Sequence, residues 1–226
     1  MNIRLMKNTL LKTVVALALF VTVSVSTAEA ARPQQDPTCT QLIPYVQPGD
    51  VLFTAVEAFV FREVAELTKS WTSHVGIIFQ QNGRWVVYES RVPKSSITPL
   101  CEFVARSTNG QVALKRFNQS LNAQQISILQ QAASERLGYF YHQGFDYDNN
   151  KRFFCSKYVY DVYQQIGVNM GKIESFKQLF ENNPNADVEF WTKWYLGNIP
   201  WTRRTVTPAS QLNDPNWITI FSNNVE

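Results

Sequence analysis

The sequence predicts a fold of the α+β class, made of antiparallel strands and amphipathic helices. Two β-rich runs, residues 75–79 and 85–89, flank an Asn-Gly pair, which is a strong signal for a β-hairpin. Apolar residues recur at helical spacing over residues 122–137 and 154–166, and a glycine follows each run, as at the end of a helix.

The remaining elements are predicted from shorter signals. Further strands are expected at residues 51–53, 111–117 and 217–221, and further helices at residues 57–69 and 99–106. Residues 139–152 are aromatic, polar and acidic without a period, so we expect a loop that borders a functional site. The segment before residue 217 is rich in turn signals, and residues 31–40 are expected to form a polar entry segment.

The first thirty residues have the composition of a secretory signal peptide. Basic residues precede an apolar run over residues 13–25, and Ala28 and Ala30 are small residues at the positions that a signal peptidase reads. The run is short for a membrane span, and no second run of about twenty apolar residues follows it, so we expect no transmembrane segment in the mature chain. We expect a secreted or periplasmic protein with one domain over residues 31–226; an uncleaved anchor is the alternative.

The charge of the mature chain is close to neutral. The full sequence has 21 Lys and Arg against 18 Asp and Glu. The leader contains three basic residues and one acidic residue, so 18 against 17 remain and the net charge is +1. Because no basic run of the kind that binds nucleic acid is present either, we do not expect a nucleic-acid partner.

Three cysteines remain after removal of the leader. In an oxidising compartment, an odd number suggests one disulfide and one free thiol, with Cys39 and Cys101 as the pair and Cys155 as the thiol. Three unpaired cysteines are an equally good interpretation, because the sequence contains no distance. A zinc site is disfavoured, since there is no Cys-x-x-Cys pair and His74 and His142 lie far apart in the chain, so no metal or cofactor is expected.

Cys155 and His74 supply the two groups that thiol catalysis requires. At the start of a helix, the helix dipole and a nearby histidine lower a thiol pKa from about 8.5 into the range where it is a nucleophile at neutral pH. The backbone N–H at that position can also bind an oxyanion. A buried apolar role for Cys155 and a hydrogen-bonded core role for His74 are the ordinary alternatives.

The predicted hairpin places an acidic side chain near His74. If Asn82 and Gly83 are the central turn residues, Gln81 pairs with Arg84, and Glu89 then lies on the same sheet face as His74, on a neighbouring diagonal. This is the arrangement of a general base and its orienting acid. The alternative for Glu89 is a solvated acid at a strand end.

Six short motifs follow one another in the order of a known enzyme family. They are Pro48-Gly49-Asp50-Val51-Leu52-Phe53, Ser73-His74-Val75-Gly76-Ile77, Val87-Tyr88-Glu89, Thr98-Pro99-Leu100, Lys115-Arg116-Phe117 and Phe154-Cys155-Ser156. Over about residues 46–166, the chain resembles the permuted papain-like cysteine hydrolases of the NlpC superfamily, the YiiX, YebB and YaeF group. Ordinary papain-like enzymes have the cysteine first, whereas here His74 precedes Cys155, as in the permuted group.

The resemblance implies a circularly permuted papain-like (NlpC-type) α+β fold, with the cysteine helix packed on an antiparallel sheet. It also implies a triad in which Cys155 is the nucleophile, His74 the general base and then acid, and Glu89 the residue that orients the imidazole. The substrate class that it implies, together with the signal peptide, is an amide of a peptidoglycan stem peptide or a small amino acid. The expected partner is thus a small-molecule, peptide or lipid acyl substrate, and a peripheral contact with the cell envelope is compatible with it.

The chain departs from the family pattern in two places. The family often continues its cysteine motif with Ser-Glu-Leu-Val, but Lys157 replaces the acid here, and a usual Tyr-Asp pair reads Tyr141-His142. Tyr141, His142 and Phe154 are candidate substrate-binding residues, with a simple loop role as the favoured alternative for His142.

The sequence is also compatible with two other functions. A lipid esterase or acyltransferase would use the same triad, with an apolar groove lined by aromatic residues, for which core packing is the alternative. The aromatic residues are Phe145, Tyr147, Phe153 and Phe154. A non-catalytic cell-envelope binding protein with a degenerate site is the other possibility.

Overall fold

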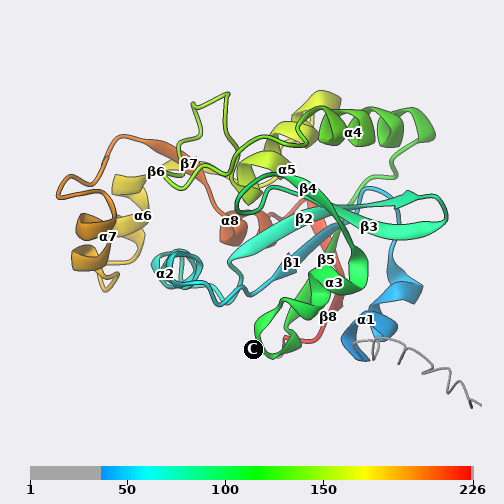
Figure 1. Ribbon diagram of the computed structural model, residues 1–226, viewed down its shortest axis with the longest axis horizontal. Coiled ribbons are helices and arrows are strands. Elements are labelled where there is room, and N and C mark those ends of the chain that lie inside the picture. Colours follow the sequence, from blue (N-terminus) through cyan, green and yellow to red (C-terminus); the bar gives the residue numbers. More distant parts are fainter. Residues whose placement is uncertain (1–36, 225–226) are drawn as a thin grey trace, which may run out of the picture. The chain divides into compact units, whose positions relative to one another are not determined.

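The computed structural model describes residues 37–224, so the predicted leader lies outside the described residues. Its centre is a six-stranded antiparallel sheet with the strand order β4-β3-β2-β1-β5-β8 (Figure 1). The strands are β1 Val51–Thr54, β2 His74–Gln81, β3 Arg84–Glu89, β4 Ser96–Pro99, β5 Val112–Phe117 and β8 Trp217–Ser222. A second, two-stranded sheet pairs β6 Ile173–Ser175 with β7 Arg204–Val206.

Helices cover both faces of the large sheet, and others surround the small one (Figure 1). The α-helices are α1 Pro37–Leu42, α2 Phe59–Leu67, α3 Leu100–Ala105, α4 Ala123–Glu135, α5 Cys155–Tyr163, α6 Phe176–Asn182, α7 Val188–Trp194 and α8 Pro208–Leu212. Short 3-10 turns are η1 Ile43–Tyr45, η2 Thr108–Gly110 and η3 Gln164–Ile166. Among the described residues, none of these helices has the length and apolar character that crossing a bilayer requires.

Each face of the large sheet has its own hydrophobic core, because alternate residues of a strand point to opposite faces. The core against α4 and α5 includes Phe53, Ile77, Leu129 and Val159, and the core against α1 and α3 includes Leu52, Ile78, Leu42 and Val104. The two cores make three layers, and they hold α5 against the sheet. The predicted packing of the cysteine helix on an antiparallel sheet is therefore confirmed.

The hairpin is the element that the sequence predicted most exactly. Asn82 and Gly83 have φ values of 51° and 74°, as a type I′ turn requires at both central positions. Gln81 pairs with Arg84, and the same register continues to Ile77 and Tyr88. The predicted register is confirmed, and with it the common face of the two site-bearing strands.

Most other predicted elements are confirmed within a few residues at their ends, including the loop over residues 139–152. Helix α5 continues into η3 and stops at Gly167, which has a left-handed φ of 73°. The segment predicted only as turn-rich contains α6, α7, α8 and the small sheet. These helices have seven residues or fewer, which is too short for a period of 3.6 to be visible. Helix α1, with six residues, was missed in the entry segment for the same reason.

The structure decides between the two interpretations of the cysteines. Cys39 in α1 and Cys101 in α3 form a disulfide, and Cys155 is the free thiol.

Two of the motifs quoted from the sequence, those that contain Asp50 and Arg116, are joined by an ion pair. Arg116 in β5 donates two hydrogen bonds of 2.7 Å to the buried carboxylate of Asp50, which precedes β1.

The glycine of the histidine motif is required by close packing. A Cβ atom on Gly76 would lie 2.4 Å from Cγ1 of Val87 and 3.1 Å from the carbonyl oxygen of Tyr88, both on the neighbouring strand. We expect Gly76→Ala to lower the free energy of unfolding by about 1–3 kcal/mol, measured by chemical denaturation, because the neighbours must move. The control is Gln80→Ala on the exposed end of the same strand, with an expected change below about 0.5 kcal/mol. Equal losses in both variants would contradict this explanation.

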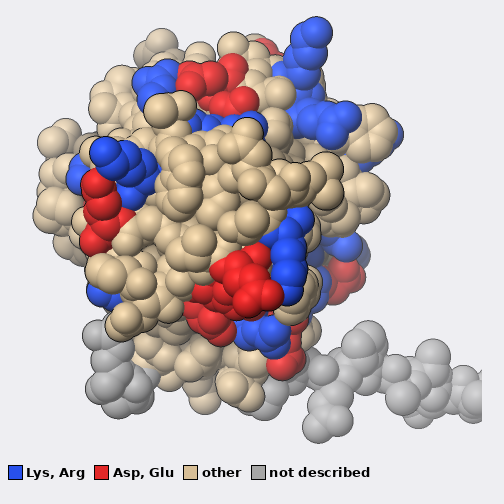
Figure 2. All heavy atoms as spheres, turned by 90° about the vertical axis from the view of Figure 1, so that its left-hand side faces the viewer, with Lys and Arg blue, Asp and Glu red and all other residues tan. Residues whose placement is uncertain are grey.

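Helices α2, α6 and α7 and the small sheet share a third apolar cluster, with Trp191 at its centre. Figure 2 shows this side of the molecule, where charged side chains of both signs lie in mixed groups separated by uncharged surface. Phe154, which directly precedes α5, belongs to this cluster, so the cluster lies beside the start of α5.

Candidate active site

The first residue of α5 and the first residue of β2 meet at one end of the large sheet. The Sγ atom of Cys155 lies 3.9 Å from the carbonyl oxygen of Ser73, the residue before His74, and the thiol is near enough to the imidazole to raise the pKa of His74. Both side chains are buried. Phe154, the residue before the helix, has no side-chain group that caps the backbone N–H groups at the start of α5.

Glu89 contacts the other side of the imidazole. Its Oε2 lies 2.6 Å from Nε2 of His74, which leaves Nδ1 as the ring nitrogen for the thiol. The other carboxylate oxygen, Oε1, accepts hydrogen bonds of 2.5 Å from Oγ1 of Thr98 and from Nη2 of Arg106. Glu89 is fully buried, so these partners replace the water that it would otherwise bind.

The charges of these groups support one another. Burial lowers the pKa of His74, but its bonds to Cys155 and Glu89 and their charges outweigh this and raise the pKa to about 9. Burial raises the pKa of Glu89, but the bond to His74, with the charge of Arg106 and the bond to Thr98, lowers the pKa to about 2. At neutral pH this arrangement favours a carboxylate beside an imidazolium.

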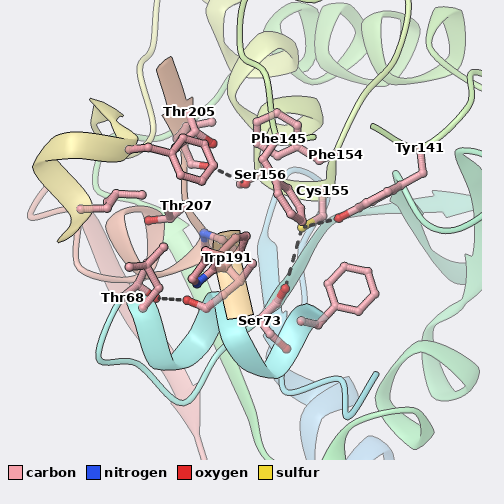
Figure 3. A pocket seen from close by; sticks show the side chains of 17 residues that line it. Thr68, Ser73, Tyr141, Phe145, Phe154, Cys155, Ser156, Trp191, Thr205 and Thr207 are labelled. Atoms are coloured by element: carbon pink, nitrogen blue, oxygen red, sulfur yellow. Dashed lines mark hydrogen bonds between the residues drawn. The ribbon is translucent and has the colours of Figure 1, made fainter. Parts of the chain in front are cut away.

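Tyr141 also lies beside the sulfur of Cys155. Its hydroxyl is 4.0 Å from Sγ of Cys155 and is directed at it (Figure 3). Burial raises the pKa of Tyr141 well above its usual value, and the charge of Cys155 raises it further. The hydrogen bond from the backbone N–H of Cys155 lowers this pKa, but by less. The phenol is therefore a neutral donor beside the sulfur and the start of the helix.

An apolar pocket lies beside the sulfur of Cys155 and is partly open to solvent (Figure 3). Its walls come from α2, the loop after Tyr141, the start of α5, α6, α7 and the chain from β7 into α8. Trp191 of α7 is 1% exposed and forms part of one wall. The C-terminal segment thus contributes directly to the site.

The structure places the predicted residues as follows. Cys155, His74 and Glu89 come together, and Tyr141 and Phe154 line the pocket. His142 does not line it; its Nδ1 accepts a hydrogen bond of 3.0 Å from the backbone N–H of Gly144 in the loop. Of the four aromatic residues proposed for an apolar groove, Phe145 and Phe154 line the pocket, whereas Phe153 lies in the core and Tyr147 packs against Tyr160.

Lys157, which stands where the family often has a glutamate, has a structural role in this chain. Lys157 is 2% exposed, pairs with Asp161 one turn later, and lies over the rings of Tyr147 and Phe153, 4.7 and 5.2 Å from their centroids. It does not line the pocket. This lysine therefore secures the loop over residues 139–152 against α5.

Two residues of the site were not predicted from the sequence. Thr98 lies in one of the quoted motifs, but its contact with Glu89 depends on the pairing of β3 with β4. Arg106 stands at the C-terminal end of α3, and no local pattern connects it with a carboxylate 17 residues earlier. Among the described residues, no three His, Cys, Asp or Glu side chains are grouped so that they could hold a metal ion.

Comparisons with known proteins agree on one group of relatives. Residues 45–221 match the family model described as the permuted papain-like amidases YaeF/YiiX, the C92 family. The uncharacterized protein YiiX of Escherichia coli strain K12 is 26% identical over 175 residues, which is 77% of this chain and 85% of that protein. A crystal structure of the metalloprotein yiiX from Escherichia coli O157:H7 has a TM-score of 0.74 at 27% identity, and covers 79% of this chain and 98% of that one.

Proposed function

This chain belongs to the permuted papain-like amidases of the YaeF/YiiX family, and from this premise we propose that it hydrolyses an amide through Cys155, His74 and Glu89. The family is one of cysteine amidases and peptidases, which settles the class of enzyme but not the substrate. The observation that carries the proposal is the position of His74, whose Nε2 lies 2.6 Å from Oε2 of Glu89 and whose pKa is raised by the neighbouring thiol of Cys155.

In the proposed reaction, the thiolate of Cys155 attacks the carbonyl carbon of the amide. The imidazolium of His74 donates its proton to the departing amine, and the acyl group stays on sulfur as a thioester. Neutral His74 then takes a proton from water, the resulting hydroxide displaces the sulfur, and a carboxylic acid is released. The imidazolium and thiolate are restored at the end of the cycle.

The developing oxyanion needs hydrogen-bond donors near the sulfur. We assign this role to the backbone N–H of Cys155 and the hydroxyl of Tyr141, which lies 4.0 Å from Sγ. Both donors are fixed before substrate binds, since one belongs to a helix start and the other to a buried side chain. Phe154 and His142 remain candidates for contacts with the substrate, the first on the pocket wall and the second in the loop.

Glu89 has a positioning role in this proposal. Thr98 and Arg106 hold its second oxygen, so the first is held in one orientation toward Nε2 of His74. A buried carboxylate in this position fixes the ring and stabilises its charged form.

The proposed location is the periplasm or the outside of the cell. The signal-peptide pattern of the first thirty residues supports export, and the Cys39–Cys101 disulfide is of the kind that persists in oxidising compartments. Peptidoglycan stem peptides and small amino-acid amides are the amide substrates proposed for that location. A lipid ester or an acyl transfer with the same triad is the second candidate, favoured by the apolar pocket.

The test is an assay of the purified mature protein on cell-wall fragments, simple acyl amides and phospholipid or thioester substrates. Protein carrying Cys155→Ala serves as the blank for each substrate. Cys155-dependent release of an amine supports the proposal, and preferential turnover of lipid esters or thioesters supports the second candidate. Absence of any Cys155-dependent product would reject both enzyme functions and favour a binding protein.

A further inference from the structure

We infer that the acyl group of the substrate is apolar and that it occupies the pocket beside Cys155, while the leaving amine lies on the side of His74. This inference rests on the proposed function, because it takes the acyl group to be the part that becomes attached to sulfur. It goes beyond that proposal in naming the chemistry of the acyl group.

The first argument is the chemistry of the pocket walls. Seventeen described residues line it, and none of them is Asp, Glu, Lys, Arg or His. Most of the apolar and aromatic ones are themselves buried: Phe61, Leu67, Tyr141, Phe145, Phe154, Phe176, Leu179, Trp191, Val206 and Pro208. A charged or strongly polar group would lose its water here without gaining a charged partner, whereas an apolar group would gain from leaving water.

The second argument is that four of the hydroxyl groups on the walls already have partners. The hydroxyl of Thr68 donates to the carbonyl of Val64 at 2.8 Å, and that of Ser156 donates to the carbonyl of Val206 at 2.7 Å. Ser73 and Thr207 likewise accept hydrogen bonds from backbone N–H groups through their hydroxyl oxygens. These walls are therefore apolar in effect.

The third argument assigns the pocket to the acyl side of the scissile bond. Cys155 lines the pocket and His74 does not. In the proposed reaction, the amine receives its proton from His74 and must lie next to that ring, while the acyl carbon is bonded to Sγ. Because the two groups leave the carbonyl carbon in different directions, the pocket lined by Cys155 but not by His74 is the space for the acyl group.

The test uses thiol reagents that do not depend on the bond cleaved. Alkyl methanethiosulfonates transfer an S-alkyl group to Cys155, forming a disulfide and releasing methanesulfinate, and the methyl, butyl and octyl reagents differ only in chain length. We expect the rate constant for Cys155, divided by that for a free thiol in solution, to rise at least tenfold from methyl to butyl. The reason is that each buried CH₂ is worth up to about a fourfold gain.

Two matched variants show whether this pocket is responsible. Val64→Trp places a large side chain on the wall, and Val60→Trp makes the same change one turn earlier on α2, where the residue is also half-buried but does not line the pocket. We expect Val64→Trp to remove the dependence on chain length, and Val60→Trp to retain it. Leu179→Phe, on the wall formed by α6, is the second variant if the first does not fold.

The outcomes separate this inference from the proposed function. Equal normalised rates for all three reagents, or equal effects of the two tryptophan variants, would overturn the inference. Hydrolysis of a series of acyl amides with one leaving group then distinguishes the two sources of an apolar acyl group. A preference for octanoyl over acetyl indicates a fatty-acyl chain, and a preference for phenylalanyl indicates an apolar amino acid. Chain-length dependence in the thiol assay, with no Cys155-dependent hydrolysis at all, would leave the apolar site standing and reject the enzyme function.

Discussion

Replacing His74 with Ala should lower the rate of amide hydrolysis by about 10³-fold and strongly slow the alkylation of Cys155 near pH 7. The turnover loss is expected because the variant has no group that can protonate the leaving amine or activate water. Alkylation should slow because the thiolate loses the positive charge to which it is paired. Iodoacetamide labelling followed by mass spectrometry measures this rate, with the disulfide-bonded cysteines unreactive.

The chain provides a matched control for this experiment, since its second histidine is the only other one in the sequence. His142→Ala should leave the alkylation rate within about twofold, because that ring contacts Gly144 in the loop and does not contact the thiol. Identical alkylation profiles with and without His74 would mean that the two side chains do not form a pair in solution.

Replacing Glu89 with Gln should reduce turnover by roughly 10²-fold and lower the pKa of His74 from about 9 toward the ordinary value of 6.5. The amide can still hydrogen-bond the ring, but it carries no charge to stabilise the imidazolium. Imidazole C–H resonances followed by NMR measure the titration of His74. Burial lowers the pKa of His142, so the two rings titrate on opposite sides of 6.5 in the wild type, and His142→Ala assigns them.

The same substitution should alter the dependence of stability on pH. The folded-state pKa of His74 lies above 6.5, so its contribution is complete below about pH 6.5 and is lost as the pH rises through about 9. The folded-state pKa of Glu89 lies below 4.5, so its contribution is present above about pH 4.5 and is lost as the pH falls toward 2. Glu89→Gln should flatten both limbs of the stability profile, and an unchanged alkaline limb would contradict the coupling of the two residues.

The sequence predicted the parts of the site that depend on local structure. The Asn-Gly turn fixes the register of the hairpin, and the register alone puts Glu89 on the face of His74. Helix α5 has a visible period and a glycine at its end, so the position of Cys155 at a helix start was also predictable.

What the sequence did not predict depends on contacts between distant segments. Arg106 reaches Glu89 only because α3 packs on the sheet. The pocket walls combine α2 with α6 and α7, which lie more than a hundred residues further along the chain and are too short to show a helical period. The disulfide was undecided for a similar reason, since its two cysteines are 62 residues apart in sequence.

The charged side chains that follow one another from Cys155 to Arg106 affect how a substrate approaches the site. In the ion-pair state, Cys155, His74, Glu89 and Arg106 carry alternating charges of −1, +1, −1 and +1, held in contact with one another. Alternating charges at such short range cancel at a distance, so the row presents almost no net field to an approaching molecule. Under the proposed function, this row therefore contributes little long-range attraction to the encounter, and we expect the substrate to be selected at close range, by shape and by the removal of apolar surface from water.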